Sequence, residues 1–195
     1  MANCAHKYLV SPHEAIQSQA ENDGTSLTTS ETDSANEGAN AARDAAYALV
    51  FINADSGEGY LEVEGNAGDR NDLKAWHNGD DLVAAVAEAN ANTIVVVHSV
   101  GPIVMESWIE LESVVAVVWA GLGGQESGNA LVDVLYGSTA PNGKLPYTIG
   151  KSADDYGTQV VGGEDNFDEG LFIDYRHFDA EGIEPRFEFG FGLCE

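Results

Sequence analysis

Three short apolar runs along the middle of the chain predict buried strands. They cover residues 48–52, 94–97 and 114–119 and contain no polar residue. Strands in a half-exposed sheet alternate apolar and polar residues, whereas strands of a parallel sheet are covered on both faces. We therefore expect a parallel sheet between layers of helices, with a further strand around residues 145–149.

Between these runs apolar residues recur at helical spacing, which predicts helices. The clearest case lies within residues 80–91, where the apolar positions are Leu82, Val83, Val86 and Ala89. Shorter helices are predicted over residues 104–111 and 125–136. Because strand and helix alternate, the sequence predicts a doubly wound α/β fold with a mainly parallel sheet covered by crossover helices.

The two ends of the chain are less regular. Ser11 followed by Pro12 predicts a helix over residues 12–21, the stretch 25–29 a short strand and the stretch 35–46 a second helix. Residues 150–195 predict an extended loop region packed by its aromatic residues, which are Phe167, Phe172, Tyr175, Phe178, Phe187, Phe189 and Phe191. We expect a single domain over residues 1–195, whose first 45 residues carry the weakest pattern.

The charge of the chain argues against two classes of partner. Eight Lys and Arg against 33 Asp and Glu give a net charge of −25, and the basic residues are scattered singly. Such a field repels nucleic acids and anionic membrane surfaces. The chain also lacks an apolar run of about 18 residues and the pattern of a secretory signal. We therefore expect no nucleic acid, no membrane partner and no signal peptide in this chain.

Cysteine and histidine spacing gives no sign of a metal or another cofactor. The two cysteines, Cys4 and Cys194, lie at opposite ends of the chain, so they match neither a disulfide framework nor a metal site. A bridge between the two termini stays open. The histidines likewise lack the spacing of metal ligands.

The segment directly after the first apolar run carries the most conspicuous candidate chemistry. There Glu58 lies between Gly57 and Gly59, and glycines allow a close approach of backbone to a ligand. A carboxyl group in such a place can act as a general acid if its surroundings raise its pKa. The alternative from the residues alone is an ordinary acidic turn.

Residues further along this polar segment have two interpretations. Asp69, Arg70 and Asp72 predict a structural ion pair, with a substrate clamp as the alternative. Trp76 lies in a polar context, where its ring could stack on a sugar instead of joining the core.

Two other motifs favour structural interpretations. The glycine-rich stretch 121–128 lacks the Gly-Lys-Ser/Thr ending of a P-loop and the dinucleotide spacing, so it predicts a tight strand-to-helix turn with Gln125 and Glu126 in the first helical turn. His98 and Ser99 lack a nucleophile elbow, so a buried, hydrogen-bonded histidine is expected.

Several sequence motifs, taken together, resemble glycoside hydrolase family 3 and in particular fungal β-glucosidases. They extend over nearly the whole chain and occupy residues 8–12, 55–60, 68–71, 97–102, 119–121, 124–130, 143–146, 169–176 and 186–193. The resemblance implies a six-stranded α/β sandwich, the second domain of the family, which follows a catalytic barrel. It also implies extracellular localisation.

The resemblance assigns a role to Glu58. It implies that Glu58 is the general acid/base for β-glucosides cleaved with retention, while the nucleophile is an Asp on the barrel, which this chain lacks. It further implies a set of sugar-facing residues, namely Ser56, Tyr60, Asp69, Arg70 and Trp76.

Two functions follow as alternatives. The first is the acid/base domain of a retaining β-glucosidase, inactive without its barrel. The second is a free-standing, lectin-like carbohydrate-binding protein. In either case a surface that normally faces a barrel is expected to be apolar, so partners would be a barrel domain or a second copy of the chain.

Overall fold

The centre of the protein is a sheet of three parallel strands. The computed structural model describes residues 7–159 and 166–193. The strands are β1 (Ala48–Ala54), β4 (Thr93–Ser99) and β5 (Val114–Trp119), in the order β1-β4-β5. All three correspond to the apolar runs of the sequence, so these strands and their parallel pairing are confirmed.

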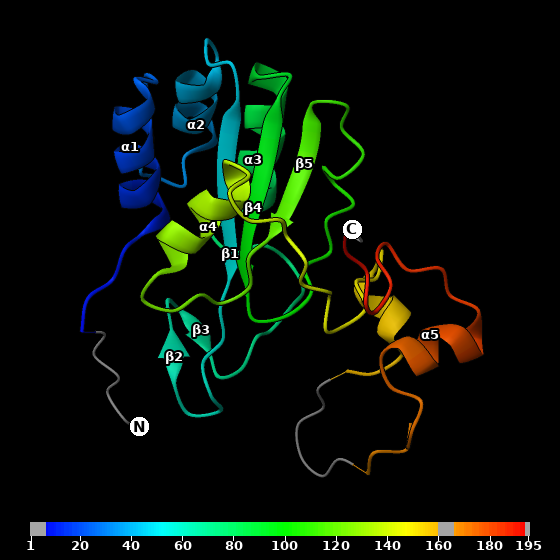
Figure 1. Ribbon diagram of the computed structural model, residues 1–195. Coiled ribbons are helices and arrows are strands. Elements are labelled where there is room, and N and C mark those ends of the chain that lie inside the picture. Colours follow the sequence, from blue (N-terminus) through cyan, green and yellow to red (C-terminus); the bar gives the residue numbers. More distant parts are fainter. Residues whose placement is uncertain (1–6, 160–165, 194–195) are drawn as a thin grey trace.

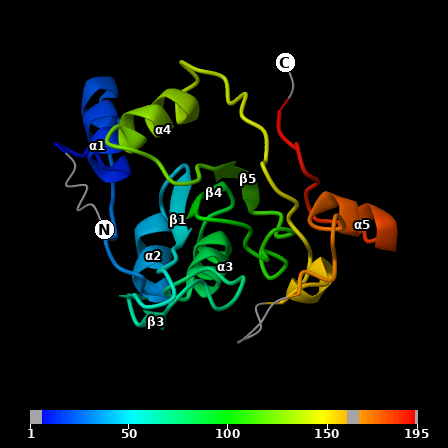
Figure 2. The ribbon, with the colours of Figure 1, turned by 90° about the horizontal axis from the view of Figure 1, so that it is seen from below.

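Helices cover this sheet on both faces, as Figure 2 shows in three layers. On one face α2 (Ala35–Ala42) packs against α3 (Gly79–Ala89), and on the other α1 (Pro12–Asp23) packs against α4 (Ser127–Leu135). The predicted doubly wound α/β architecture is therefore confirmed. The outer strand is less covered than expected, since Val115 of β5 is half exposed.

The main core lies between the sheet and the α2–α3 layer. Alternate residues of β1, among them Val50 and Ile52, meet Val83 and Val86 of α3. Trp108 is also buried there, and its indole N–H donates to Oδ1 of Asp80 over 2.8 Å. Burial raises the pKa of Asp80, although this hydrogen bond opposes the effect.

A glycine and an asparagine explain why α2 is short and lies close to α3. A β-carbon on Gly38 would lie 2.7 Å from Cδ1 of Leu82, so glycine permits the close approach of the two helices. The buried amide of Asn90 donates to the carbonyls of Ala42 and Ala45 over 2.8 and 2.7 Å. The helix predicted over residues 35–46 ends at Ala42. The Asn90 amide satisfies carbonyls that the end of the helix leaves without an intrahelical partner.

The first helix begins as its sequence predicts. The hydroxyl of Ser11 accepts from the Glu14 amide while the Glu14 carboxylate accepts from the Ser11 amide, which is a capping box, and Pro12 occupies the first turn. Val10 exchanges backbone hydrogen bonds with Gln125 and Gly128. These bonds join the start of α1 to the start of α4.

Several predicted elements are wrong. Residues 25–29 form no strand, residues 104–111 form successive turns instead of a helix, and α4 begins at Ser127, after Gln125 and Glu126. Residues 145–149 form a single antiparallel bridge, Ile149 to Phe187, and Leu145 bonds Phe191, but no continuous ladder joins the two contacts. In the described residues the main sheet has three strands, so the expected six-stranded sheet is not found there.

The C-terminal part is a loop region with two short helical segments. These are η1 (Ala153–Tyr156) and α5 (Tyr175–Glu181), which lie beyond β5 in Figure 1. Aromatic packing is only part of what holds them, since Phe178 is buried whereas Phe167 and Phe172 are exposed. The side chain of Asp174 accepts from both the amide and the hydroxyl of Thr148.

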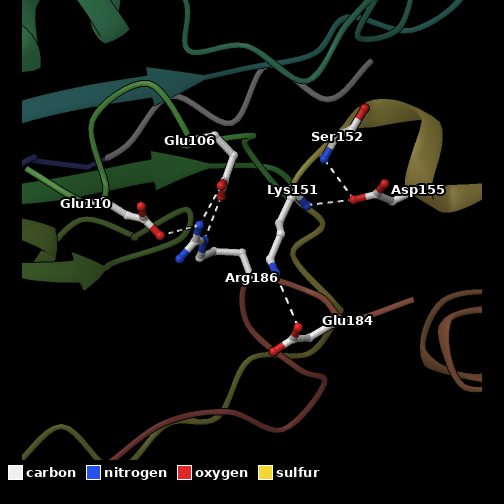
Figure 3. Close-up of polar contacts among 7 residues, drawn as sticks. All are labelled: Glu106, Glu110, Lys151, Ser152, Asp155, Glu184 and Arg186. Carbon is white, nitrogen blue, oxygen red and sulfur yellow. Dashed lines mark hydrogen bonds and ion pairs between the residues drawn. The ribbon is translucent and has the colours of Figure 1, made fainter. Parts of the chain in front are cut away.

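A second attachment of this region is a charged cluster, shown in Figure 3. The Arg186 guanidinium binds both carboxylate oxygens of Glu106, with Nε to Oε1 at 2.6 Å, and reaches Oε1 of Glu110 at 3.0 Å. The bidentate bond lowers the pKa of Glu106 and raises the pKa of Arg186. The cluster joins the C-terminal segment to the turns that follow β4.

Two further expectations concern the whole chain. Among the described residues, no helix is long and apolar enough to cross a membrane. Cys4 and Cys194 both lie outside the described residues.

The pair Glu106–Arg186 makes stability depend on pH in a defined direction. The pKa of Glu106 is lower in the folded state, so its contribution is present above the ordinary glutamate value of 4.5 and is lost as pH falls below it. We expect Glu106→Gln to lower the free energy of unfolding by about 1 kcal/mol at pH 7, and by much less at pH 3.

Urea unfolding at both pH values measures this difference. Glu112→Gln is the matched control, since Glu112 is exposed and its carboxylate makes no ion pair among the described residues. An equal loss for Glu106→Gln at pH 7 and pH 3 would contradict the assignment.

Candidate functional site

The candidate residues gather on a hairpin that follows β1. Here the Glu58 hairpin denotes residues 55–70, which contain the two short strands β2 (Glu62–Val63) and β3 (Asn66–Ala67). Backbone bonds from Gly57 to Gly68 and from Gly68 to Leu61 hold its two arms together. It lies beyond the carboxyl end of the sheet in Figure 1, the edge at which α/β folds bind ligands.

Glu58 itself projects from the base of this hairpin into solvent. Its carboxylate is exposed and has no hydrogen-bond or ion-pair partner in the described part of the chain. Gly57 is required by space, because a β-carbon there would lie 2.6 Å from the carbonyl oxygens of Gly68 and Leu61. Gly59 has open space around it. Only the first of the two glycines is therefore explained by the packing of the hairpin.

Ser56 and Arg70 close the base of the hairpin and attach it to neighbouring loops. The Ser56 hydroxyl accepts from the Arg70 amide over 3.0 Å. The Arg70 guanidinium donates to the carbonyls of Pro102 and Lys74, at 2.5 and 3.3 Å. Burial lowers the pKa of Arg70, and the charge of Asp72 opposes that shift. Arg70 thus ties the loop after β1 to the loop after β4.

The predicted ion pair of Arg70 is absent. Neither Asp69 nor Asp72 forms a salt bridge with it among the described residues, and Asp72 instead accepts from the Lys74 amide over 2.9 Å. The carbonyls of Pro102 and Lys74 accept from the Arg70 guanidinium in place of the expected carboxylate.

The remaining candidates differ in their access to solvent. Tyr60 is 80% exposed and Asp69 is exposed, so both can meet a ligand at this edge. Trp76 is only 9% exposed and belongs to the main core, and its amide donates to the Asn53 carbonyl over 2.8 Å. Stacking of Trp76 on a sugar stays a prediction, and its burial counts against it.

His98 is hydrogen-bonded as expected but only half-buried. Its Nδ1 lies 3.1 Å from the Gly121 carbonyl, its ring stacks on Phe51, and the Ser99 hydroxyl donates to the Gly101 carbonyl. Ser99 is therefore bonded to backbone, as is His98. Among the described residues, no group of three or more His, Cys, Asp and Glu side chains has the arrangement of a metal site.

One contact of the hairpin had no signal in the sequence. Oε2 of Glu64, at the turn between β2 and β3, lies 2.6 Å from Nε2 of His77. A spacing of 13 residues in a loop matches no periodic pattern, so only the folded hairpin brings the two side chains together.

The role of Arg70 as a tie is testable without any substrate. Arg70→Lys keeps the charge but loses the fork that reaches two carbonyls at once, so it is expected to lower the free energy of unfolding by about 1–3 kcal/mol. Arg43→Lys is the matched control, since exposed Arg43 reaches a single side chain of the described residues, that of Asn40. Equal urea midpoints for both variants would show that Arg70 does not support the hairpin.

Comparison with known proteins places the chain in a family. The model of the glycosyl hydrolase family 3 C-terminal domain matches residues 1–193. A probable beta-glucosidase L of Neosartorya fischeri is 64% identical over 187 residues, which are 95% of this chain and 25% of that protein. A beta-glucosidase sequence of Schizophyllum commune is 59% identical over 191 residues, 93% of this chain and 98% of that sequence.

A solved structure agrees with these relatives. Beta-D-glucoside glucohydrolase from Trichoderma reesei superposes with a TM-score of 0.93 at 61% identity, over 95% of this chain and 26% of that one. The chain thus spans about a quarter of the length of several relatives it matches. From its sequence and its fold, the chain belongs to glycoside hydrolase family 3, in which it corresponds to the C-terminal domain.

Proposed function

We propose that Glu58 is the general acid/base of a retaining β-glucosidase whose nucleophile lies outside this chain. The observation that carries the proposal is the exposed carboxylate of Glu58, which has no hydrogen-bond or ion-pair partner among residues 7–159 and 166–193. It belongs to a hairpin at the carboxyl edge of a parallel sheet. General acid/base work needs a carboxyl group that can reach a leaving oxygen and then a water. The names of several relatives, which are beta-glucosidases, agree with this chemistry.

Glu58 is not sufficient for the reaction. Retention needs a second carboxylate, about 5–5.5 Å from the first, that attacks the anomeric carbon. The family resemblance assigns that nucleophile to the barrel. We therefore propose that the chain alone hydrolyses glucosides at most at a residual rate, since one member of a catalytic pair retains little activity.

The other candidate residues divide into contacts and supports. Tyr60 and Asp69 are exposed beside Glu58 on the same hairpin and are proposed to contact the sugar. The hydroxyl of Ser56 and the guanidinium of Arg70 are engaged with backbone, so we propose that they act by holding the hairpin. The core position of Trp76 counts against its use as a stacking platform in a lectin-like protein, and the experiments below test that alternative.

An exposed apolar patch supports an interface with the rest of a longer enzyme. The C-terminal apolar patch, defined as Leu171, Phe172 and Ile173, is 79%, 58% and 49% exposed. Three successive large apolar side chains in solvent mark a surface that another chain segment covers. We propose that the barrel domain covers this patch in the complete enzyme and that a second copy covers it in the isolated chain. We also propose, from the family resemblance, that the complete enzyme is extracellular.

The catalytic role is tested in a chimera. The chain replaces the matching quarter of the Trichoderma reesei enzyme, with which it shares 61% identity. Glu58→Gln is expected to lower kcat/KM about 10²–10⁴-fold for an alkyl glucoside. The loss should be much smaller for an aryl glucoside with an acidic phenol, because such a leaving group needs little protonation.

Glu62→Gln is the matched control, because Glu62 is exposed on β2 of the same hairpin. An equal fall in kcat/KM for both substrates in Glu58→Gln would argue against an acid/base role for Glu58. Calorimetric titration of cellobiose into the isolated chain tests the lectin-like alternative, which saturable binding without turnover would favour.

The interface is tested by the oligomeric state of the isolated chain. We expect self-association in sedimentation at about 0.5 M NaCl, since salt screens the repulsion between chains of charge −25. The double change Leu171→Ser and Phe172→Ser should shift the chain to monomer, whereas Leu122→Ser, at an exposed position after β5, should not. A wild-type chain that stays monomeric at high salt would contradict the proposal.

A further inference from the structure

In the described residues, the tip of the Glu58 hairpin meets the body of the domain through Val63, which packs against the core, and through one ion pair. Oε2 of Glu64 lies 2.6 Å from Nε2 of His77, the residue before the N-cap of α3. On its other side His77 faces Asp33, with Nδ1 4.0 Å from Oδ2. The three side chains come from the hairpin, the start of α3 and the loop before α2.

The backbone on both sides of this contact is in an unfavourable conformation. Glu64 and Gly65 form the two-residue turn between β2 and β3 and have φ angles of 48° and 85°. Turns of this kind strongly favour Asn or Asp before Gly, because a larger side chain resists positive φ. His77 also has positive φ, at 55°. The turn therefore carries a glutamate that its local geometry disfavours, which points to a role for the side chain.

We infer that Glu64 and His77 are positioning residues that hold the Glu58 hairpin through a pH-dependent ion pair. Ser56 and Arg70 fix the base of the hairpin, whereas nothing else among the hydrogen bonds and ion pairs of the described residues ties its tip to a helix. Because the same hairpin carries Glu58, the ion pair sets how freely the carboxylate moves. This consequence for catalysis rests on the proposed function, but the attachment itself does not.

The charges around His77 give the direction of the pH dependence. Glu64 and Asp33 face its ring from two elements, and Asp80 and Asp81 follow in the first turn of α3. Histidine changes its charge between about pH 5 and 8, whereas glutamate stays ionised over this range. Only a protonated imidazole attracts these carboxylates as an ion pair, so we expect the hairpin to be held more firmly in mild acid than in alkali.

Hydrogen exchange of the isolated chain measures this attachment directly. The amides of Gly57, Leu61 and Gly68 report on the hairpin, since each donates a backbone hydrogen bond within it. After correction for intrinsic rates, Glu64→Gln is expected to exchange about two- to fivefold faster than wild type at pH 5.5 and at the same rate at pH 8.5. Glu62→Gln should match wild type at both values.

A second variant separates the ion pair from turn chemistry. Glu64→Asn supplies the residue that the turn favours but removes the carboxylate that meets His77. We expect the wild-type difference between pH 5.5 and pH 8.5 to disappear in Glu64→Asn as it does in Glu64→Gln. The inference is overturned if either variant keeps that difference, or if wild type shows none.

The same variants in the chimera link the attachment to catalysis. Glu64→Gln should lower kcat at pH 5.5 with KM unchanged, and approach the parent at alkaline pH. If Glu58→Gln has no effect there, the proposed function fails while the exchange result stands. If exchange shows no pH-dependent difference, the attachment fails and Glu58 keeps its proposed role.

Discussion

The parallel pairing of β1 with β4 is the constraint on which the site depends. Ala54 lies opposite Ser99, so the two strands end at one level and their loops leave the sheet side by side. Arg70, in the loop that follows β1, can therefore reach the carbonyl of Pro102 in the loop that follows β4. A shift of this register by one residue would turn every buried side chain of β1 to the other face and would separate the two loops.

The fold was predictable where a local pattern had one solution. The three apolar runs predicted strands, of which β1 and β4 are largely buried and β5 is partly exposed, and the spacing of apolar residues predicted α3. Two of the failures depend on a distant partner. Residues 145–149 have strand-like content, but they meet only part of residues 187–191. Likewise α2 ends where Asn90, far away in sequence, binds its carbonyls.

The candidate site shows the same distinction between local patterns and contacts with distant residues. Glu58 is predicted from a local signal, a carboxylate between glycines after a buried strand. The role of Arg70 depends on carbonyls of residues 74 and 102, and no local pattern announces a backbone acceptor. The contact of Glu64 with His77 left no trace in composition or spacing. What the sequence does contain is a glutamate in a turn that favours asparagine, a departure that has meaning only after the hairpin is known.

The return of the C-terminal segment to residues 145–149 has a consequence for the order of folding. Leu145 and Ile149 can form their bonds with Phe191 and Phe187 only after the intervening chain has closed into a loop. Closure of this kind costs entropy before any contact repays it. The pairing of β1 with β4 closes a loop of similar length, but every partner in the unit of β1, β4, α2 and α3 lies before residue 100. A chain still emerging from the ribosome can therefore assemble the edge that carries Glu58 before its last 45 residues exist.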